Sequence, residues 1–116
     1  MNQNNNAIEQ RLDQSKLPTQ LRAVLTIVTA DEELKQKALP FVNVQRREID
    51  WQSIFRHDLS SGHRAALIFA KICWLDEMPL KADPFDRAFS MDQRLRVAVL
   101  QALSIRWNIN QREEVT

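Results

Sequence analysis

Both histidines of the chain, its one glycine and its one cysteine fall in a single stretch, residues 56–74, RHDLSSGHRAALIFAKICW. Imidazole, carboxylate and thiolate are ligands of Zn²⁺ and Fe²⁺, so the first candidates for a metal site are His57, Asp58, His63 and Cys73. Helical metal motifs place their ligands at i and i+4 or as Glu-x-x-His, whereas these histidines lie on either side of a predicted helix break. The spacing therefore argues against a metal site. We expect no metal and no other cofactor, and a small metal-dependent enzyme is kept only as the second alternative function.

A nucleophile paired with a histidine base is the other chemistry that this stretch offers, with Cys73 or Ser61 as the nucleophile. Cys73 lies among apolar residues in a predicted helix, where burial disfavours the reactive thiolate. Ser60 and Ser61 are better placed to cap that helix, and the acidic pair Asp76 and Glu77 suits a helix end. One glycine cannot build a Gly-rich phosphate loop. We therefore predict no catalytic residue and a protein that is not an enzyme.

The composition indicates that helices position these side chains. Hydrophobic residues make up 44% and charged residues 27% of the 116 residues, as in ordinary globular proteins. One glycine and no tyrosine disfavour hairpins, whose turns usually need glycine. The sequence predicts an all-α fold without a sheet, a compact single-domain bundle of four to six helices. This domain spans residues 7–110, between a disordered polar N-terminus (1–6) and a frayed C-terminus (111–116).

Apolar periodicity and capping residues place the helices. Pro18 starts an amphipathic helix that runs to about Thr29, and Asp31 starts a second, which Pro40 ends near Ala38. The polar stretch VNVQRREID at 42–50 is predicted as a long loop, and its last residue, Asp50, caps a short helix. A further short segment begins at 83–84.

Two longer helices are expected to pack together at the centre of the bundle. The helix at 62–77 is apolar nearly all the way round. A capping box formed by Ser90 and Gln93 opens the last helix, 91–107, which is also expected to be largely buried because Val97, Leu100 and Trp107 extend its apolar face.

The charge balance disfavours nucleic acid. Sixteen basic and fifteen acidic residues give a net charge of +1, with both signs interspersed. Gly62 sits in a predicted turn between helices, as in a helix-turn-helix motif. The helix that follows is too apolar to be a recognition helix, which needs polar side chains to contact bases in a DNA groove. A nucleic-acid-binding regulator is therefore the first alternative function. Its candidate residues are Arg46, Arg47, Arg56 and Arg64, with Arg87, Arg94, Arg96 and Arg106 as a second set.

Two helices that are apolar beyond one stripe offer more hydrophobic surface than a small bundle hides, so we predict a non-enzymatic protein–protein interaction or regulatory module. A second copy of the chain is the expected partner, as a homodimer or another homo-oligomer. The interface candidates are Trp51, Trp74 and Trp107. A single cysteine, no secretory signal in MNQNNNAIEQ and no apolar run of membrane-spanning length predict a cytoplasmic protein without a membrane partner.

Overall fold

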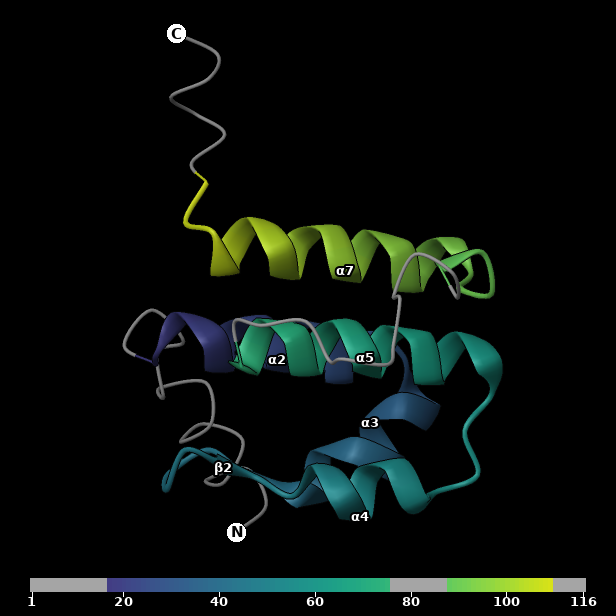
Figure 1. Cartoon of the computed structure of the whole chain (residues 1–116), viewed down its shortest axis with the longest axis horizontal. Coiled ribbons are helices and arrows are strands. Elements are labelled where there is room, and N and C mark those ends of the chain that lie inside the picture. The colour runs from purple at the N-terminus through teal and green to yellow at the C-terminus, as the bar shows by residue number, and fades with distance from the viewer. Residues whose placement is uncertain (1–16, 76–87, 110–116) are drawn as a thin grey trace, which may run out of the picture.

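The computed structural model describes residues 17–75 and 88–109, which form a mostly helical, compact fold. Three long helices pack against one another: α2 packs on both α5 and α7, and α5 packs on α7. Figure 1 shows α7 as one layer, α2 and α5 as the next, and α3, α4 and a small hairpin as the third. By the colours of that figure, α2 runs antiparallel to α5 and α7. In chain order, the elements are α2 (Thr19–Val28), α3 (Glu32–Ala38), the 3-10 helix η2 (Leu39–Phe41), β1 (Val42–Asn43), β2 (Glu48–Ile49), α4 (Trp51–Arg56), α5 (Ser61–Leu75) and α7 (Gln93–Arg106).

The all-α prediction is confirmed, and the helix at Pro18 is α2. Pro18 precedes its first turn, where the missing N–H costs nothing. Six of the ten residues of α2 are buried, which makes this helix as central to the core as α5. The sequence placed only α5 and α7 at the centre, because the apolar face of α2 looks like one side of a surface helix.

The predicted start and end of α3 are also confirmed. The Asp31 side chain accepts a hydrogen bond from the Leu34 N–H at 2.7 Å, and the helix ends at Ala38. Pro40 then follows in η2, since a proline N cannot donate the next helical bond.

The long loop predicted at 42–50 is wrong, because β1 and β2 form an antiparallel hairpin there. Val42 pairs with Ile49, and Asn43 with Glu48. The turn needs no glycine: Arg47 adopts the left-handed region at φ 58°, and the Asn43 carboxamide oxygen accepts from the Arg46 N–H at 2.9 Å. The absence of glycine was therefore a weak argument against a hairpin of this size.

The helices α4 and α5 start as expected. Asp50 caps α4 by accepting from the Ser53 N–H, and Ser60, rather than Ser61, caps α5 by accepting from the His63 N–H at 3.0 Å. Gly62 does not lie in a turn between helices, as the sequence suggested. It is buried in the first turn of α5, where a Cβ would come 2.7 Å from the Ser90 carbonyl oxygen. The glycine lets the segment before α7 approach α5.

The last helix differs from its prediction at its start and on its outer face. Its N-cap is Asp92, whose carboxylate accepts from the Leu95 N–H at 2.9 Å, so the capping box of Ser90 and Gln93 does not form. Within α7, only four residues are buried, namely Leu95, Ala98, Val99 and Ala102. The expectation of a largely buried helix is wrong.

Several predictions lie outside the described residues: the disordered N-terminus, the segment starting at 83–84, the acidic pair at 76–77 that would end the helix at 62–77, and the frayed C-terminus. Among the described helices, none has both the length and the apolar character needed to cross a membrane.

Candidate functional site

The structure separates the two histidines. His57 follows α4, where its ring Nδ1 lies 3.0 Å from the Ser53 carbonyl oxygen. His63 lies in the first turn of α5, and Cys73 is 2% exposed near the other end of that helix. Asp58 is exposed in the loop between α4 and α5. Within residues 17–75 and 88–109, no three histidine, cysteine or acidic side chains form a group able to hold a metal ion.

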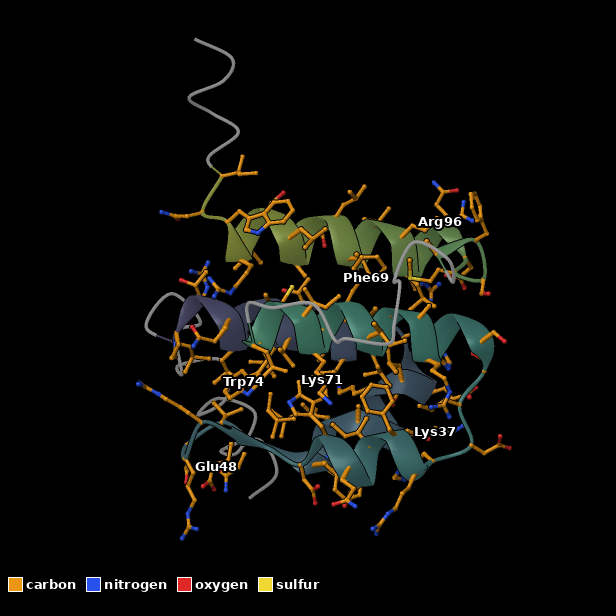
Figure 2. All side chains as sticks on the ribbon, viewed as in Figure 1. Lys37, Glu48, Phe69, Lys71, Trp74 and Arg96 are labelled. Carbon is orange, nitrogen blue, oxygen red and sulfur yellow. The ribbon has the colours of Figure 1, made fainter. Side chains whose placement is uncertain are left out.

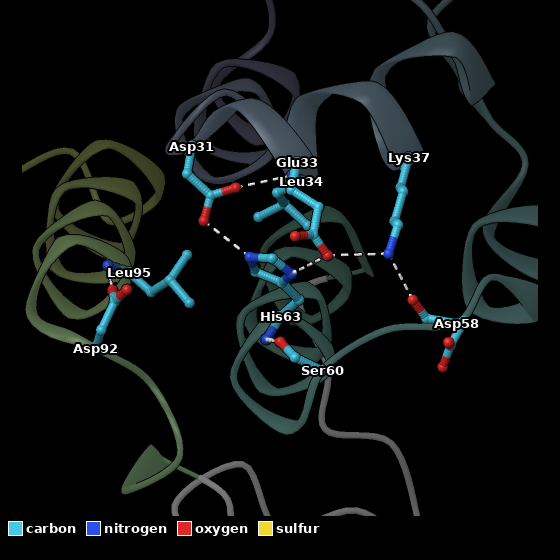
Figure 3. Close-up of polar contacts among 9 residues, drawn as sticks. All are labelled: Asp31, Glu33, Leu34, Lys37, Asp58, Ser60, His63, Asp92 and Leu95. Atoms are coloured by element: carbon cyan, nitrogen blue, oxygen red, sulfur yellow. Dashed lines mark hydrogen bonds and ion pairs between the residues drawn. The ribbon is translucent and has the colours of Figure 1, made fainter.

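His63 instead joins a polar cluster that links the starts of α3 and α5 (Figure 3). Its Nε2 lies 2.8 Å from an oxygen of Asp31, and its Nδ1 lies 3.6 Å from Glu33. Lys37 pairs with Glu33 at 2.9 Å and donates to the Asp58 carbonyl oxygen. The His63 ring is therefore held between two carboxylates of α3 and its N-cap.

The electrostatics of this cluster favour ionised carboxylates. Burial raises the pKa of Asp31, but the hydrogen bonds from the Leu34 N–H and from His63, and the charge of His63, outweigh it and leave the pKa below its usual value. The hydrogen bond from Lys37 lowers the pKa of Glu33. His63 is only 8% exposed and its ring nitrogens face these two groups. This geometry fastens the start of α5 to α3.

The four first-choice arginines do not gather into one patch. Arg46 and Arg47 are exposed in the hairpin turn, and Arg56 ends α4. Figure 1 shows the hairpin turn and the end of α4 on opposite sides of the molecule. Arg64 lies on α5, with its guanidinium 6.0 Å from the centre of the Phe55 ring.

The three tryptophans differ in exposure. Trp51 is half-buried and stacks on Phe55 at 6.2 Å between ring centres, and Trp74 is half-buried against the core. Figure 2 shows Trp74 on the side of α5 that faces the hairpin. Trp107, directly after α7, is 62% exposed. Of these candidates, Trp107 is the one that offers a large free aromatic surface.

Trp107 belongs to an exposed apolar stripe along the outer side of α7. We define the α7 stripe as Phe89, Val97, Leu100 and Trp107, with exposed fractions of 87%, 45%, 65% and 62%. The last three fall within about 80° of one another around the helix. Phe89 precedes α7 and Trp107 directly follows it, so the two aromatic side chains lie at the two ends of the stripe. On soluble proteins, an exposed apolar patch of several hundred Å² is often an interaction site.

A groove of about 560 Å³ runs beside the stripe, between α2 and α7. Val97 belongs to both features, so the stripe and the groove form one continuous surface. The groove's most buried lining residues, Leu25 and Ala98, are apolar, whereas Val97 is 45% exposed at its edge. Its lining residues are Leu25, Thr26, Thr29 and Ala30 from α2 and the turn that follows it, and Gln93, Arg94, Val97, Ala98 and Gln101 from α7.

The two helices that border the groove carry only one sign of charge. Arg22 lies on α2, and Arg94, Arg96 and Arg106 lie on α7, while neither helix contains Asp or Glu. Arg94 and Arg96 are exposed, and Arg106 donates to the Cys73 carbonyl oxygen at 2.7 Å. The net charge of the chain is near zero, but the charged residues within α2 and α7 are all basic.

Comparison of the chain with protein-family models, curated proteins and solved structures returned no match.

The sequence interpretation missed this surface although its residues were in view. The apolar pattern predicts that Val97, Leu100 and Trp107 extend the buried face of the last helix, whereas all three are exposed. The spacing of positions 95, 98, 99 and 102 could have distinguished buried from exposed apolar residues, because these four positions already form one complete stripe of the helix. They are the buried positions of α7.

Proposed function

We propose that this chain is a non-enzymatic protein-binding module, with an interaction or regulatory role, that docks its partner on the outer side of α7. The observation that supports this most directly is the α7 stripe, in which Phe89, Leu100 and Trp107 are each more than 60% exposed. Exposed aromatic side chains next to arginine are typical of the residues that dominate binding energy at interfaces.

The contrast between the two sides of α7 strengthens this proposal. The inner side packs small and branched residues such as Ala102 and Val99 against the other long helices. The outer side carries larger apolar groups that the fold leaves in water, where they do not stabilise the monomer. A partner that covers them gains the hydrophobic contribution of that area.

A homo-oligomer and a cytoplasmic location stay predictions from the sequence. The single buried thiol at Cys73 is consistent with a reducing compartment.

Photo-crosslinking in living cells tests the proposed function. A photoreactive phenylalanine analogue replaces Leu100 in the stripe or, as a control, exposed Gln52 on α4. We expect a discrete protein adduct from position 100 and none from position 52, and mass spectrometry of the adduct distinguishes a second copy from another protein. Equal adducts from the two positions, or none from position 100, would contradict the proposal.

Nucleic-acid binding is the second candidate, and the carboxylate-free helices α2 and α7 favour it. Binding of labelled single-stranded or duplex oligonucleotides would then weaken steeply with salt, with a log–log slope of about 0.9 per phosphate contacted on duplex DNA. Apolar docking on the stripe predicts a much shallower dependence.

A further inference from the structure

The groove between α2 and α7 has the shape and the polarity that suit an added helix. The two helices run antiparallel and leave a furrow whose floor is formed by the buried Leu25 and Ala98 and whose edge carries Val97; Thr26 and Gln101 also line it. An amphipathic helix that lies in such a furrow presents apolar residues at i, i+3, i+4 and i+7 to the floor. The three packed helices would then become four.

Arginines are distributed along this furrow. Arg94 lines it beside Thr29, near the C-terminal end of α2. Arg22 lies one helical turn before the groove residue Thr26 and on the same face of α2, so it extends the lining toward the other end. Arg96 is exposed on the stripe side of α7.

Two carboxylates lie near this surface, but among the described residues neither forms a salt bridge with Arg94 or Arg22. Asp31 lies close enough to Arg94 for the two charges to interact, but its oxygens already accept from the Leu34 N–H and face His63. Asp92 is engaged as the N-cap of α7. The exposed arginines are therefore available to carboxylates of a partner.

We infer that the occupant of this groove is an acidic amphipathic helix of another protein, whose apolar face lies on Leu25, Val97 and Ala98 and whose flanking carboxylates pair with Arg94 and Arg22. The inference rests on the proposed function and names the chemistry of the partner.

Charge complementarity selects this occupant over the alternatives. A second copy docked through the same face would bring two carboxylate-free, arginine-bearing helix pairs together, and like charges across an interface oppose association. A nucleic acid would meet the arginines but leave the apolar floor and the adjoining stripe uncovered, whereas an acidic amphipathic helix matches both.

Selection from a library of displayed amphipathic helices tests the inference. The library keeps apolar residues at i, i+3, i+4 and i+7 and randomises the flanking positions equally between Glu, Lys, Gln and Ala. The full-length protein is the bait, and selected peptides are titrated against wild type, Arg94→Glu, Val97→Asp and the control Arg56→Glu, which changes an exposed arginine on α4. Circular dichroism verifies that each variant is folded.

We expect the selected peptides to be enriched in Glu, to lose about tenfold in affinity with Arg94→Glu, and to bind Arg56→Glu like wild type. A selection repeated on Arg94→Glu should shift the enrichment toward Lys. Peptides without acidic enrichment that lose binding with Val97→Asp but not with Arg94→Glu would overturn the inference while leaving the proposed function standing.

Three other results would overturn it differently. No selected peptide that depends on Val97 would count against both the inference and a helix-binding form of the proposed function. In sedimentation velocity, a wild-type dimer that Arg94→Glu leaves intact and Val97→Asp dissociates would show a second copy as the occupant. Oligonucleotide binding that Arg94→Glu abolishes and the uncharged variant Val97→Ser retains would assign the surface to nucleic acid.

Discussion

Replacing Gly62 by alanine tests the close approach between the first turn of α5 and the segment before α7. The backbone at Gly62 does not use positive φ, so glycine is not needed there for conformational reasons. Its added Cβ would lie 2.7 Å from the Ser90 carbonyl oxygen and 3.4 Å from the Met91 Cα. Both neighbours are backbone atoms, which cannot move aside as the end of a side chain can.

Two opposing effects set the magnitude. Alanine is favoured over glycine inside a helix by up to about 1 kcal/mol. Ordinary contact requires the segment at Ser90 to retreat by roughly 0.7 Å, and overpacking of this kind costs about 1–3 kcal/mol. Because Met91 next to it is only 5% exposed, the shift also disturbs the core. We expect Gly62→Ala to lower the free energy of unfolding by about 1–2 kcal/mol and the melting temperature by about 5–10 °C.

Urea unfolding followed by circular dichroism measures this change, with Ser61→Ala as the matched control. Ser61 is exposed in the same first turn, so its replacement reports the propensity gain without a clash. If Gly62→Ala is as stable as the control variant, the segment before α7 does not rest on α5 and the reasoning is refuted.

Three further changes give contrasting outcomes. Although burial raises the pKa of Asp31, hydrogen bonds to its carboxylate hold it below 3.8, so its stabilising contribution is present above that pH and is lost as the pH falls further. Urea titrations from pH 7 to pH 2 should therefore show a smaller loss of stability for Asp31→Asn than for wild type, and equal losses would contradict the role given to this pair with His63. Leu67→Ala, at a fully buried position, should cost about 2–5 kcal/mol in the same assay at pH 7. Leu100→Ala, at a position 65% exposed, should change stability by less than about 0.5 kcal/mol; a cost near that of Leu67→Ala would mean that the stripe is covered within the monomer.

Much of the local structure could be predicted because capping is a short-range effect. Asp31, Asp50 and Ser60 each accept from a backbone N–H three residues later, and the sequence alone places such residues at helix starts. The same reasoning chose Ser90 over Asp92 for α7, since both have suitable side chains and only packing decides between them.

The candidate site depended on tertiary packing that no short pattern encodes. The hydrogen bond between His63 and Asp31 joins residues 32 positions apart. Whether Leu100 is buried or exposed depends on which side of α7 the other helices occupy, and an apolar residue is compatible with either. The carboxylate-free pair α2 and α7 was hidden because acidic residues elsewhere in the chain balance the total charge.

The core is completed only when α2, the first described helix, packs on α7, the last one. About 65 residues separate the end of α2 from the start of α7, so their contact closes a long loop and is slow to form compared with local helix pairing. At synthesis rates of 5–20 residues per second, roughly 3–13 s pass between the synthesis of the end of α2 and that of the start of α7. During that interval, residues such as Val24 and Ile27, fully buried in the folded chain, are exposed on the nascent polypeptide and are natural targets for chaperones.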